Sequence, residues 1–254
     1  MISRTAIYVL WLREMKRFLR AKSRIVGTVA MPLFFLLFLG MGFRRIAIPG
    51  MSEDMDYLRY LVPGILGMNL LFSSTFGGLS VLWDREFGFL KEIMVAPVSR
   101  VSIVLGRIAG GVTTALMQGL FILGISSLMG FRMNSILSLG MTIVFMVLIS
   151  VAFLGFGLIF ASKMKDMQGF PIVMNFVIFP LLFLSGAFYP LENFPFWLRY
   201  ISYLDPLTYG VDGLRGVLIG VSTYSIFFNF VMMVGFAMLM ILLGAYFFEK
   251  SESV

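Results

Sequence analysis

Side chains that could carry out chemistry are sparse in this sequence, and two versatile types are missing. Its 254 residues include no His and no Cys. Without His there can be no Ser-His or Cys-His catalytic pair and no His-ligated haem or zinc. Without Cys there can be no disulfide, thiolate metal site or iron–sulfur cluster. We therefore expect no catalytic residue, no metal site and no bound cofactor on this chain.

The lysines exclude one further class of chemistry. A P-loop needs the sequence Gly-Lys-Ser/Thr, because its amides and its Lys hold the phosphates. None of the lysines here follows a glycine. The sequence therefore predicts no ATPase of the P-loop kind, and ATP with its magnesium would have to be bound by another polypeptide.

The remaining composition is that of a membrane protein. Hydrophobic residues make up 59% of the chain and charged residues 13%, whereas a soluble domain carries about 25% charged residues. A transmembrane helix needs about 20 apolar residues. The sequence predicts an all-α integral membrane protein, a single domain over residues 1–254 with six transmembrane helices. The predicted spans are Ile25–Phe43, Leu61–Trp83, Val101–Met129, Leu137–Ala161, Phe170–Tyr189 and Ile226–Phe248.

The charge excess indicates the orientation of these spans. Six spans place both termini on one side, and the segments on that side hold 14 Lys/Arg against 7 Asp/Glu. The segments on the other side hold 6 Arg against 6 acids, so the whole net charge of +7 lies on the first side. Positive loops stay in the cytoplasm. We expect a multi-pass protein of the prokaryotic plasma membrane with both termini cytoplasmic, and no nucleic-acid partner.

The spans themselves are almost free of ionisable groups. Only Arg107, near a span end, interrupts them. Carriers driven by a proton or ion gradient usually keep such groups in the membrane, so an ion-coupled secondary carrier is a weaker interpretation. Small residues within the spans, such as Gly155 and the stretch Gly106–Gly119, favour close helix packing over the lining of a path.

Residues 1–24 predict an amphipathic helix in the membrane interface. At 100° per residue, Ile7, Trp11, Met15 and their apolar neighbours share one face. Such a helix lies with its apolar face down and its basic face toward lipid headgroups. It could be a simple topology anchor or a mechanical element. The residues that we expect to matter are Trp11, Arg13, Lys16, Arg17 and Arg20.

Residues 84–100 predict a second amphipathic helix, on the cytoplasmic side. Its apolar face is formed by Trp83, Phe87, Leu90 and Met94, and Pro97 stops it. The charged residues beside that face are Asp84, Arg85, Glu86, Lys91 and Glu92. A helix of this kind suits docking into the groove of a partner, although another interfacial helix fits the same periodicity.

Residues 190–225 form the longest segment between spans. Pro190, Pro195 and Pro206 divide it into two predicted short helices, and it is rich in Trp and Tyr. Apolar helices too short to span are re-entrant or interfacial. The aromatic residues also fit a plain outer belt at the membrane surface.

Two motifs carry a family resemblance. Asp84–Arg100 resembles the cytoplasmic motif of type-2 ATP-binding-cassette (ABC) permeases, in which acidic-Arg-Glu-x-Gly-Thr-Leu-Glu precedes Leu-Leu-x-x-Pro-Val-Ser-Arg. Leu184–Arg215, with Ser-Gly-Ala-Phe-Tyr-Pro-Leu-Glu-Asn-Phe-Pro after its first residue, resembles the second motif of that family. Phe89 and Lys91 depart from the common Thr and Glu. The chain is identified as a member of this family, similar to its multidrug and daunorubicin-resistance export permeases.

The resemblance implies a subunit arrangement. Members resemble one half of an exporter, pair with a second permease copy, and bind two copies of a separate ABC ATPase subunit. A homodimer is favoured here over a heterodimer, and membrane lipid is the other partner. The resemblance makes residues 1–24 an interfacial connecting helix beside a coupling helix within residues 84–100, and residues 190–225 outer re-entrant helices.

The resemblance also assigns site residues. Those expected to contact the ATPase are Arg85, Glu86, Phe87, Leu90, Glu92 and Met94. Those expected to matter in the outer segment are Tyr189, Pro190, Trp197, Asp205, Pro206, Tyr209, Asp212 and Arg215.

The function expected from sequence is export, by ATP hydrolysis on the partner subunit, of a hydrophobic or amphipathic molecule such as a drug or lipid. Twenty Met and 28 Phe suit an adaptable apolar path, but they suit lipid-facing helices equally. The alternatives are a polysaccharide or lipid-linked glycan exporter, a non-transporting membrane scaffold, and an ion-coupled secondary carrier.

Overall fold

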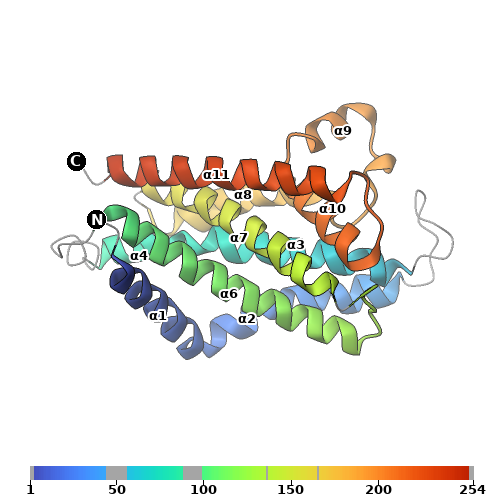
Figure 1. The fold of residues 1–254 in the computed structure, drawn as a ribbon, viewed down its shortest axis with the longest axis horizontal. Coiled ribbons are helices and arrows are strands. Elements are labelled where there is room, and N and C mark those ends of the chain that lie inside the picture. The colour runs from blue at the N-terminus through green and yellow to red at the C-terminus, as the bar shows by residue number, and fades with distance from the viewer. Residues whose placement is uncertain (1–2, 44–55, 88–98, 136, 165, 252–254) are drawn as a thin grey trace.

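The computed structural model consists, in the part of the chain that it describes, of helices and connecting turns (Figure 1). The described residues are 3–43, 56–87, 99–135, 137–164 and 166–251. The long helices run side by side along one axis, with both ends of the chain near one end of the bundle. In chain order the elements are α1 Arg4–Arg20, α2 Lys22–Phe35, the π-helix η1 Leu36–Met41, α3 Tyr57–Gly77, α4 Leu79–Glu86, α6 Arg100–Leu128, α7 Ser138–Lys163, α8 Gly169–Leu184, the 3-10 helix η2 Leu191–Asn193, α9 Phe196–Ser202, α10 Pro206–Ile219 and α11 Ile226–Ser251.

Helix α3 lies at the centre of the bundle. It begins at the N-cap Asp56, whose Oδ1 accepts the backbone N–H of Leu58 at 3.1 Å. Most of its residues are buried, and it packs against α6, α7 and α10. A helix that is apolar all round must be covered on every side. This central position makes α3 the element that connects the two ends of the molecule.

Four helices are long and apolar enough to cross a membrane, among the residues that the structure describes. They are Tyr57–Asp84, Val101–Leu128, Ser138–Lys163 and Ile226–Phe247. The first and fifth predicted spans correspond to the shorter apolar helices Val26–Met41 and Gly169–Leu184. The total of six spans therefore stays a prediction, whereas the all-helical membrane architecture is confirmed.

The fifth predicted span is shorter as a helix than its hydropathy suggested. α8 has 16 residues, which gives a length of about 24 Å at 1.5 Å per residue, against a hydrocarbon core of about 30 Å. The chain leaves the helix at Ser185 and turns at Gly186, whose φ of +72° is a conformation that L side chains rarely adopt. The apolar run continues through this turn, so hydropathy alone overestimates the helix.

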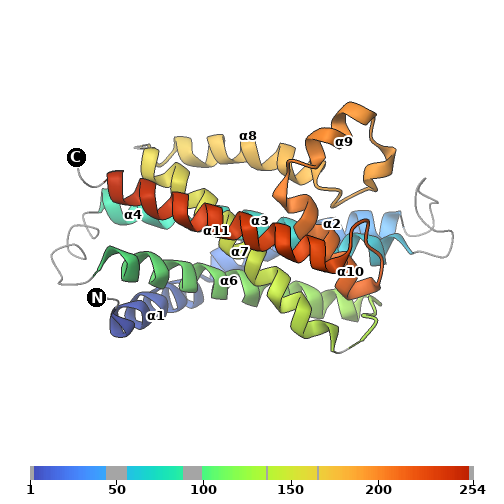
Figure 2. The same cartoon turned by 45° about the horizontal axis from the view of Figure 1, so that its top comes forward.

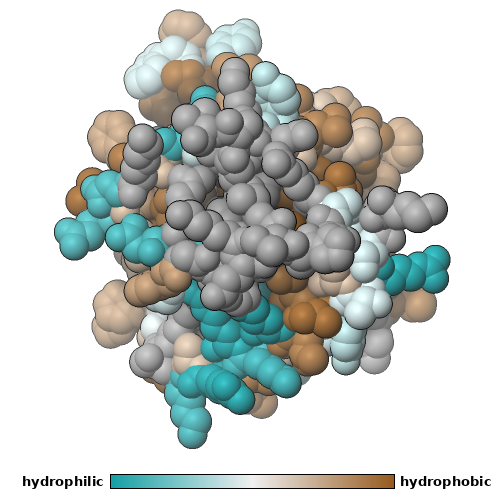
Figure 3. Space-filling model, turned by 90° about the vertical axis from the view of Figure 1, so that its left-hand side faces the viewer, coloured by the Kyte–Doolittle hydropathy of each residue, from teal (hydrophilic) through white to brown (hydrophobic). Residues whose placement is uncertain are grey.

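Large apolar side chains cover the flanks of the bundle. Phe176 on α8, Phe227 and Leu242 on α11 are 84%, 76% and 68% exposed. Continuous apolar surface of this kind faces lipid or another subunit rather than water. Figure 3, which views the end where the two termini lie, has such apolar surface around its rim.

Close helix contacts occur at small residues, as the sequence predicts. A Cβ added at Gly155 of α7 would lie 2.8 Å from the backbone carbonyl carbon of Met240 in α11. Gly106 and Gly110, one turn apart on α6, face α1 in the same way, with Leu10 Cβ and Glu14 Cβ at 2.8 and 2.7 Å. Glycine at these positions lets helix backbones approach closely.

Helix α1 packs along α6 at the end of the molecule that holds the termini (Figures 1 and 2). It begins at the N-cap Ser3, whose Oγ accepts the N–H of Ala6, and it buries Leu10, Met15 and Phe18. Tyr8 and Leu19, which share the predicted apolar face, remain more than half exposed. The apolar face is therefore divided between protein contact and the surroundings.

Two short helices, α9 and α10, lie at the opposite end, in the segment that three prolines divide. Pro195 is the N-cap residue of α9, and Pro206 occupies the first turn of α10, where a missing N–H removes no hydrogen bond. α10 ends at Gly220, which has a φ of +76°. α10 is buried over most of its length between α3, α7 and α11.

Candidate functional site

Polar side chains gather at the two ends of the molecule. We name the first group the ion cluster: Arg13, Glu14, Arg17, Asp84 and Arg107. It lies at the end where the chain begins and ends. We name the second group the far-end cap: Tyr57, Tyr60, Gly186, Asp212, Arg215 and Asn229. Buried polar groups are costly in a membrane protein, so they mark places with a structural or functional role.

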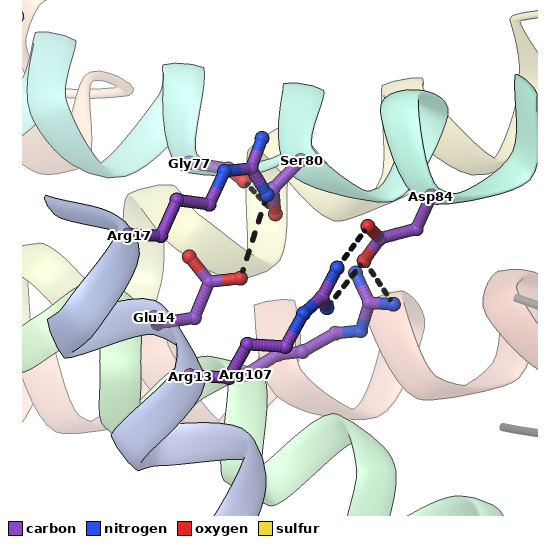
Figure 4. Close-up of polar contacts among 7 residues, drawn as sticks. All are labelled: Arg13, Glu14, Arg17, Gly77, Ser80, Asp84 and Arg107. Atoms are coloured by element: carbon purple, nitrogen blue, oxygen red, sulfur yellow. Dashed lines mark hydrogen bonds and ion pairs between the residues drawn. The ribbon is translucent and has the colours of Figure 1, made fainter. Parts of the chain in front are cut away.

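Asp84 is the centre of the ion cluster. Its Oδ1 lies 2.6 Å from Arg13 Nη2, and its Oδ2 lies 3.0 Å from Arg13 Nη1 and 2.8 Å from Arg107 Nη2. Figure 4 shows both guanidinium groups directed at the carboxylate. Its side chain and that of Arg107 are each 5% exposed. One carboxylate thus holds α1, α4 and α6 together, because removing either cation would leave a buried charge.

The other members of the ion cluster extend it along α1. Arg17 Nη1 lies 3.7 Å from Glu14 Oε1, and the Arg17 guanidinium carbon lies 5.0 Å from the ring centre of Trp83. The hydrogen bonds and charge of Asp84 raise the pKa of Arg13, against partial burial that lowers it. Arg13 therefore stays charged at neutral pH.

This arrangement changes two expectations from sequence. Asp84 was expected among the charged residues beside the coupling-helix face, but it is 4% exposed, because α3 and α4 carry it against α1 and α6. Arg13 was expected on a face turned to lipid headgroups, but it points to Asp84. Lys16 and Arg20 are exposed, and Trp11 Nε1 donates to Thr113 Oγ1 at 3.1 Å.

The residues expected to contact an ATPase divide into two sets. Arg85 and Glu86 end α4, and Phe87 follows as a turn residue, 78% exposed. Leu90, Glu92 and Met94 lie outside the described residues. Figure 3 shows hydrophilic side chains gathered at the lower edge of this end, where Figure 1 has α1.

Asp212 organises the far-end cap. Its Oδ1 accepts the backbone N–H of Thr223 at 2.7 Å, and its Oδ2 accepts the N–H of Tyr224 at 3.0 Å and Asn229 Nδ2 at 2.8 Å. The residue is 4% exposed. Three donors satisfy the buried carboxylate, so it fixes the turn between α10 and α11.

Arg215 ties α10 to the turn after α8. Its Nη2 donates to Gly186 O at 2.9 Å, and its guanidinium carbon lies 3.8 Å from the ring centre of Tyr60. Tyr60 Oη donates to the same Gly186 carbonyl, and Tyr57 Oη donates to Phe188 O, both at 3.0 Å. The second sequence motif is thus bound to α3 by hydroxyl-to-backbone contacts.

The other residues expected in the outer segment take local roles. Asp205 is the N-cap of α10 and accepts the Leu207 N–H at 2.9 Å, and burial raises its pKa well above the usual value. Tyr209 Oη donates to Tyr203 O at 2.8 Å. Tyr189 packs edge-on against Phe194, and Pro190 is the N-cap residue of η2. Trp197 on α9 remains 54% exposed.

Several members of both groups escaped sequence reasoning. Glu14, Asp84 and Arg107 were not expected in a site, nor were Tyr57, Tyr60 and Asn229. One available signal was Arg107, the lone charge in the spans, because a buried charge needs a partner. Asn229 in the last span carried a similar signal, since a buried amide needs hydrogen-bond partners.

The arrangement holds helices in place. Among the described residues, no group of three or more Asp or Glu side chains is placed to hold a metal ion. The carboxylate of Asp84 pairs with arginines, and that of Asp212 accepts hydrogen bonds from backbone N–H groups and from the side-chain amide of Asn229. Such networks define which helices move together when an external force acts on one of them.

Comparison with known proteins identifies the family. The family model described as ABC-2 type transporter matches residues 5–219. The inner membrane transport permease YadH of Escherichia coli strain K12 is 28% identical over 235 residues, covering 91% of this chain and 90% of the relative. The ycf38 protein of Cyanophora paradoxa is 29% identical over 210 residues, covering 82% and 72%.

A third relative is more distant. Nodulation protein J of Rhizobium meliloti strain 1021 is 26% identical over 202 residues, covering 79% of this chain and 76% of the relative. The matches extend over both sequence motifs and most of the helices described above. On this match and its apolar helices, the chain belongs to the ABC-2 type transporter family, whose members are multi-pass membrane permease subunits rather than enzymes.

Proposed function

We propose that this chain is the permease subunit of an exporter that moves a hydrophobic or amphipathic, drug-like or lipid-like, molecule out of the cytoplasm. Two copies of a separate ATPase subunit supply the energy. A second copy of this chain completes the translocation path, and the termini lie in the cytoplasm. Family membership supports the transporter class, and the ion cluster is the observation that supports coupling to an ATPase.

The ion cluster supplies a mechanical route from the ATPase to the helices. α4 ends at Glu86, directly before the rest of the proposed coupling segment, and Asp84 in its last turn binds Arg13 of α1 and Arg107 of α6. Buried ion pairs resist separation, because each charge loses its partner without gaining water. A displacement at the end of α4 therefore moves three helices together, as a rigid-body switch requires.

The far-end cap fits the opposite end of this transport cycle. α9 and α10 are the proposed re-entrant helices on the outer side, and α2 with η1 and α8 complete six spans. Asp212 and Arg215 hold α10 to α11 and to the turn at Gly186. Such a braced cap can open and close as a unit rather than melt.

Substrate class rests on composition and on the exposed apolar flanks. Side chains such as Phe176 and Phe227 give a second copy an apolar surface to pack against, and a path between two such copies would suit apolar cargo. A polysaccharide or lipid-linked glycan is the alternative cargo. A scaffold without transport, or a carrier driven by an ion gradient, is the alternative class.

The test is ATPase coupling in a reconstituted complex. Phe87→Asp places a charge on the exposed side chain that follows α4, and Phe196→Asp makes the same change on α9, where Phe196 is 76% exposed. We expect Phe87→Asp to lower substrate-stimulated ATP hydrolysis and transport at least tenfold with normal insertion, and Phe196→Asp to keep the stimulation. Glu86→Arg and Leu90→Asp are expected to act as Phe87→Asp does.

Three outcomes separate the alternatives. If Phe87→Asp kept the full substrate stimulation of ATP hydrolysis, this result would contradict the coupling proposal. ATPase binding without ATP-dependent flux in vesicles would select the scaffold. Flux that survives ATP depletion but collapses with the proton or sodium gradient would select the secondary carrier.

A further inference from the structure

A cavity of about 250 Å³ lies inside the single chain, beside the ion cluster. Its walls come from α1, α2, α3, α4, α6 and α7. On α6 the lining residues Arg107, Gly111, Thr114 and Gln118 follow one helix face. Eleven residues at 1.5 Å each give a length of about 16 Å along α6. The cavity is therefore long and narrow, with room for one extended chain.

One end of the cavity is charged. Arg107 and Glu14 line it there, together with Ser80. Arg107 Nη2 faces Asp84, while its Nε and Nη1 have no hydrogen-bond partner among the residues that the structure describes. The side chain of Arg107 is only 5% exposed, so these guanidinium donors are buried. Unsatisfied buried donors of this kind indicate a missing acceptor.

The donors of Arg107 favour an anion at this end. The ion cluster contains the cations Arg13, Arg17 and Arg107 and the anions Asp84 and Glu14. The buried guanidinium of Arg107 shares Asp84, its ion-pair partner, with Arg13, and its Nε and Nη1 have no acceptor among the described residues. An anionic group beside Nε and Nη1 would accept these hydrogen bonds and give Arg107 a further counter-charge.

The rest of the cavity is largely apolar. Met31, Phe72, Phe76 and Leu158 are among its lining residues. Asn69 and Gln118, 3% and 4% exposed, stand among them, and their Oδ1 and Oε1 lack a partner within the described part of the chain. A volume of 250 Å³ equals that of about eight waters at roughly 30 Å³ each. Apolar walls hold ordered water poorly, whereas they suit a hydrocarbon chain.

We propose that this cavity binds a single-chain segment of an anionic amphiphile, with its phosphate or carboxylate head at Arg107 and its hydrocarbon chain along α6 toward Gln118. The site lies within one protomer and is separate from a path between two copies. It therefore does not depend on the identity of the exported molecule. Occupancy would brace α6 around Asp84, since the head would accept the Arg107 donors that Asp84 leaves unsatisfied.

The experiment measures binding to the purified full chain in a neutral detergent by thermal shift and native mass spectrometry. Three probes separate head from chain: dodecyl phosphate, dodecyltrimethylammonium with the same chain, and inorganic phosphate without a chain. We expect dodecyl phosphate to bind at least tenfold more tightly than either of the others. Equal binding of the two amphiphiles, or no binding at all, would overturn the proposal and leave a water-filled cavity.

Two variants locate the site. Ser73→Phe fills the cavity from α3 without touching the ion cluster, and Ser127→Phe makes the same change at an exposed position of α6. We expect Ser73→Phe to weaken dodecyl phosphate binding at least tenfold and Ser127→Phe to leave it unchanged. Arg107→Gln should abolish the preference for the phosphate head, and Arg107→Lys should keep part of it.

Unchanged binding in Ser73→Phe would place the amphiphile elsewhere and contradict the proposal, even if Arg107→Gln fails to fold. Co-purified phosphatidylglycerol retained by the parent chain and lost from Ser73→Phe would identify a bilayer lipid as the source. Retention of free palmitate alone would identify a fatty acid. Failure of the ATPase-coupling test above would leave these binding measurements unaffected.

Discussion

The carboxylate of Asp84 lies 2.6 Å from the guanidinium of Arg13, although 71 residues separate them in sequence. This pair, completed by Arg107, joins the amphipathic first helix to α4, the helix that leads into the segment 84–100. It places the two segments that the family resemblance assigns to the cytoplasmic side in direct contact. The connection explains why two arginines, Arg13 and Arg107, pair with one carboxylate in a chain with so few charges.

Asp84→Asn tests this connection. The change removes the ion-pair partner of the buried Arg107 and one partner of the partly exposed Arg13, so we expect the free energy of unfolding to fall by about 3–5 kcal/mol. Thermal unfolding in lipid nanodiscs measures it. Glu86→Gln, two residues later and exposed, is the matched control and should stay within about 0.5 kcal/mol of the parent. An equal loss of unfolding free energy in both variants would show that Asp84 has no special role in holding these helices together.

Gly110→Ala tests the contact between α1 and α6. Its Cβ would lie 2.7 Å from Glu14 Cβ, so α1 must shift, and we expect a loss of about 1–3 kcal/mol. Gly124 lies on the same helix with no atom within 4 Å of an added Cβ. Gly124→Ala should therefore be neutral or stabilising by up to about 1 kcal/mol. A spin-label distance between α1 and α6 that does not change in Gly110→Ala would contradict the packing.

Asp205→Asn tests the consequence of a raised pKa. Because burial raises the pKa of Asp205 in the folded protein, the protonated form is favoured by folding. Its contribution to stability is complete below the unfolded value of about 3.9 and is lost as pH rises through the folded pKa. Asn is neutral at every pH and still accepts the Leu207 N–H, so the stability of the variant relative to the parent should be higher at pH 7 than at pH 4.

The control for Asp205→Asn is Asp205→Ala, which removes the charge and the helix cap together. We expect Asp205→Ala to be less stable than Asp205→Asn by about 1 kcal/mol, since the N-cap hydrogen bond at 2.9 Å is lost. Unfolding curves at pH 4 and pH 7 provide the comparison. A parent protein whose stability rises between these pH values as much as that of Asp205→Asn would show that the carboxyl does not titrate as described.

Asp212→Leu tests the far-end cap. The change leaves three donors without their acceptor: the backbone N–H groups of Thr223 and Tyr224 and the side-chain amide of Asn229. Hydrogen bonds to a charged group contribute about 1.5–3 kcal/mol each, so we expect a loss of at least about 3 kcal/mol and faster proteolysis of the turn between α10 and α11. Asp212→Asn keeps one acceptor oxygen and should lose less. Glu192→Gln, an exposed acid in the same segment, should change neither measurement.

Single cysteines test the orientation, because the chain has no Cys of its own to give background labelling. Lys163 at the end of α7 and Thr223 in the turn before α11 are exposed at opposite ends of the bundle. We expect a membrane-impermeant maleimide to label Thr223→Cys in intact cells and Lys163→Cys only after permeabilisation. The reverse order would invert the proposed topology.

The sequence alone determined the class of protein, because composition and apolar run length depend on no contact between distant residues. Apolar runs located the helices, and Pro190, Pro195 and Pro206 predicted the two short helices that the structure shows as α9 and α10. The family followed from two motifs that can be recognised without a structure. Run length overestimated the helix at α8, where the apolar stretch continues through the turn at Gly186, and the first predicted span also corresponds to a shorter apolar helix, Val26–Met41.

Only the tertiary structure decided which helix faces meet. α7 is apolar around its whole circumference, so periodicity cannot say which side packs against α3 and which against α11. The same limit hid the ion cluster: Asp84, Arg13 and Arg107 come from three helices, and their pairing depends on how closely Gly106 and Gly110 let α1 approach α6. Local sequence encodes each helix, but the partner of a buried charge is set by packing across the whole bundle.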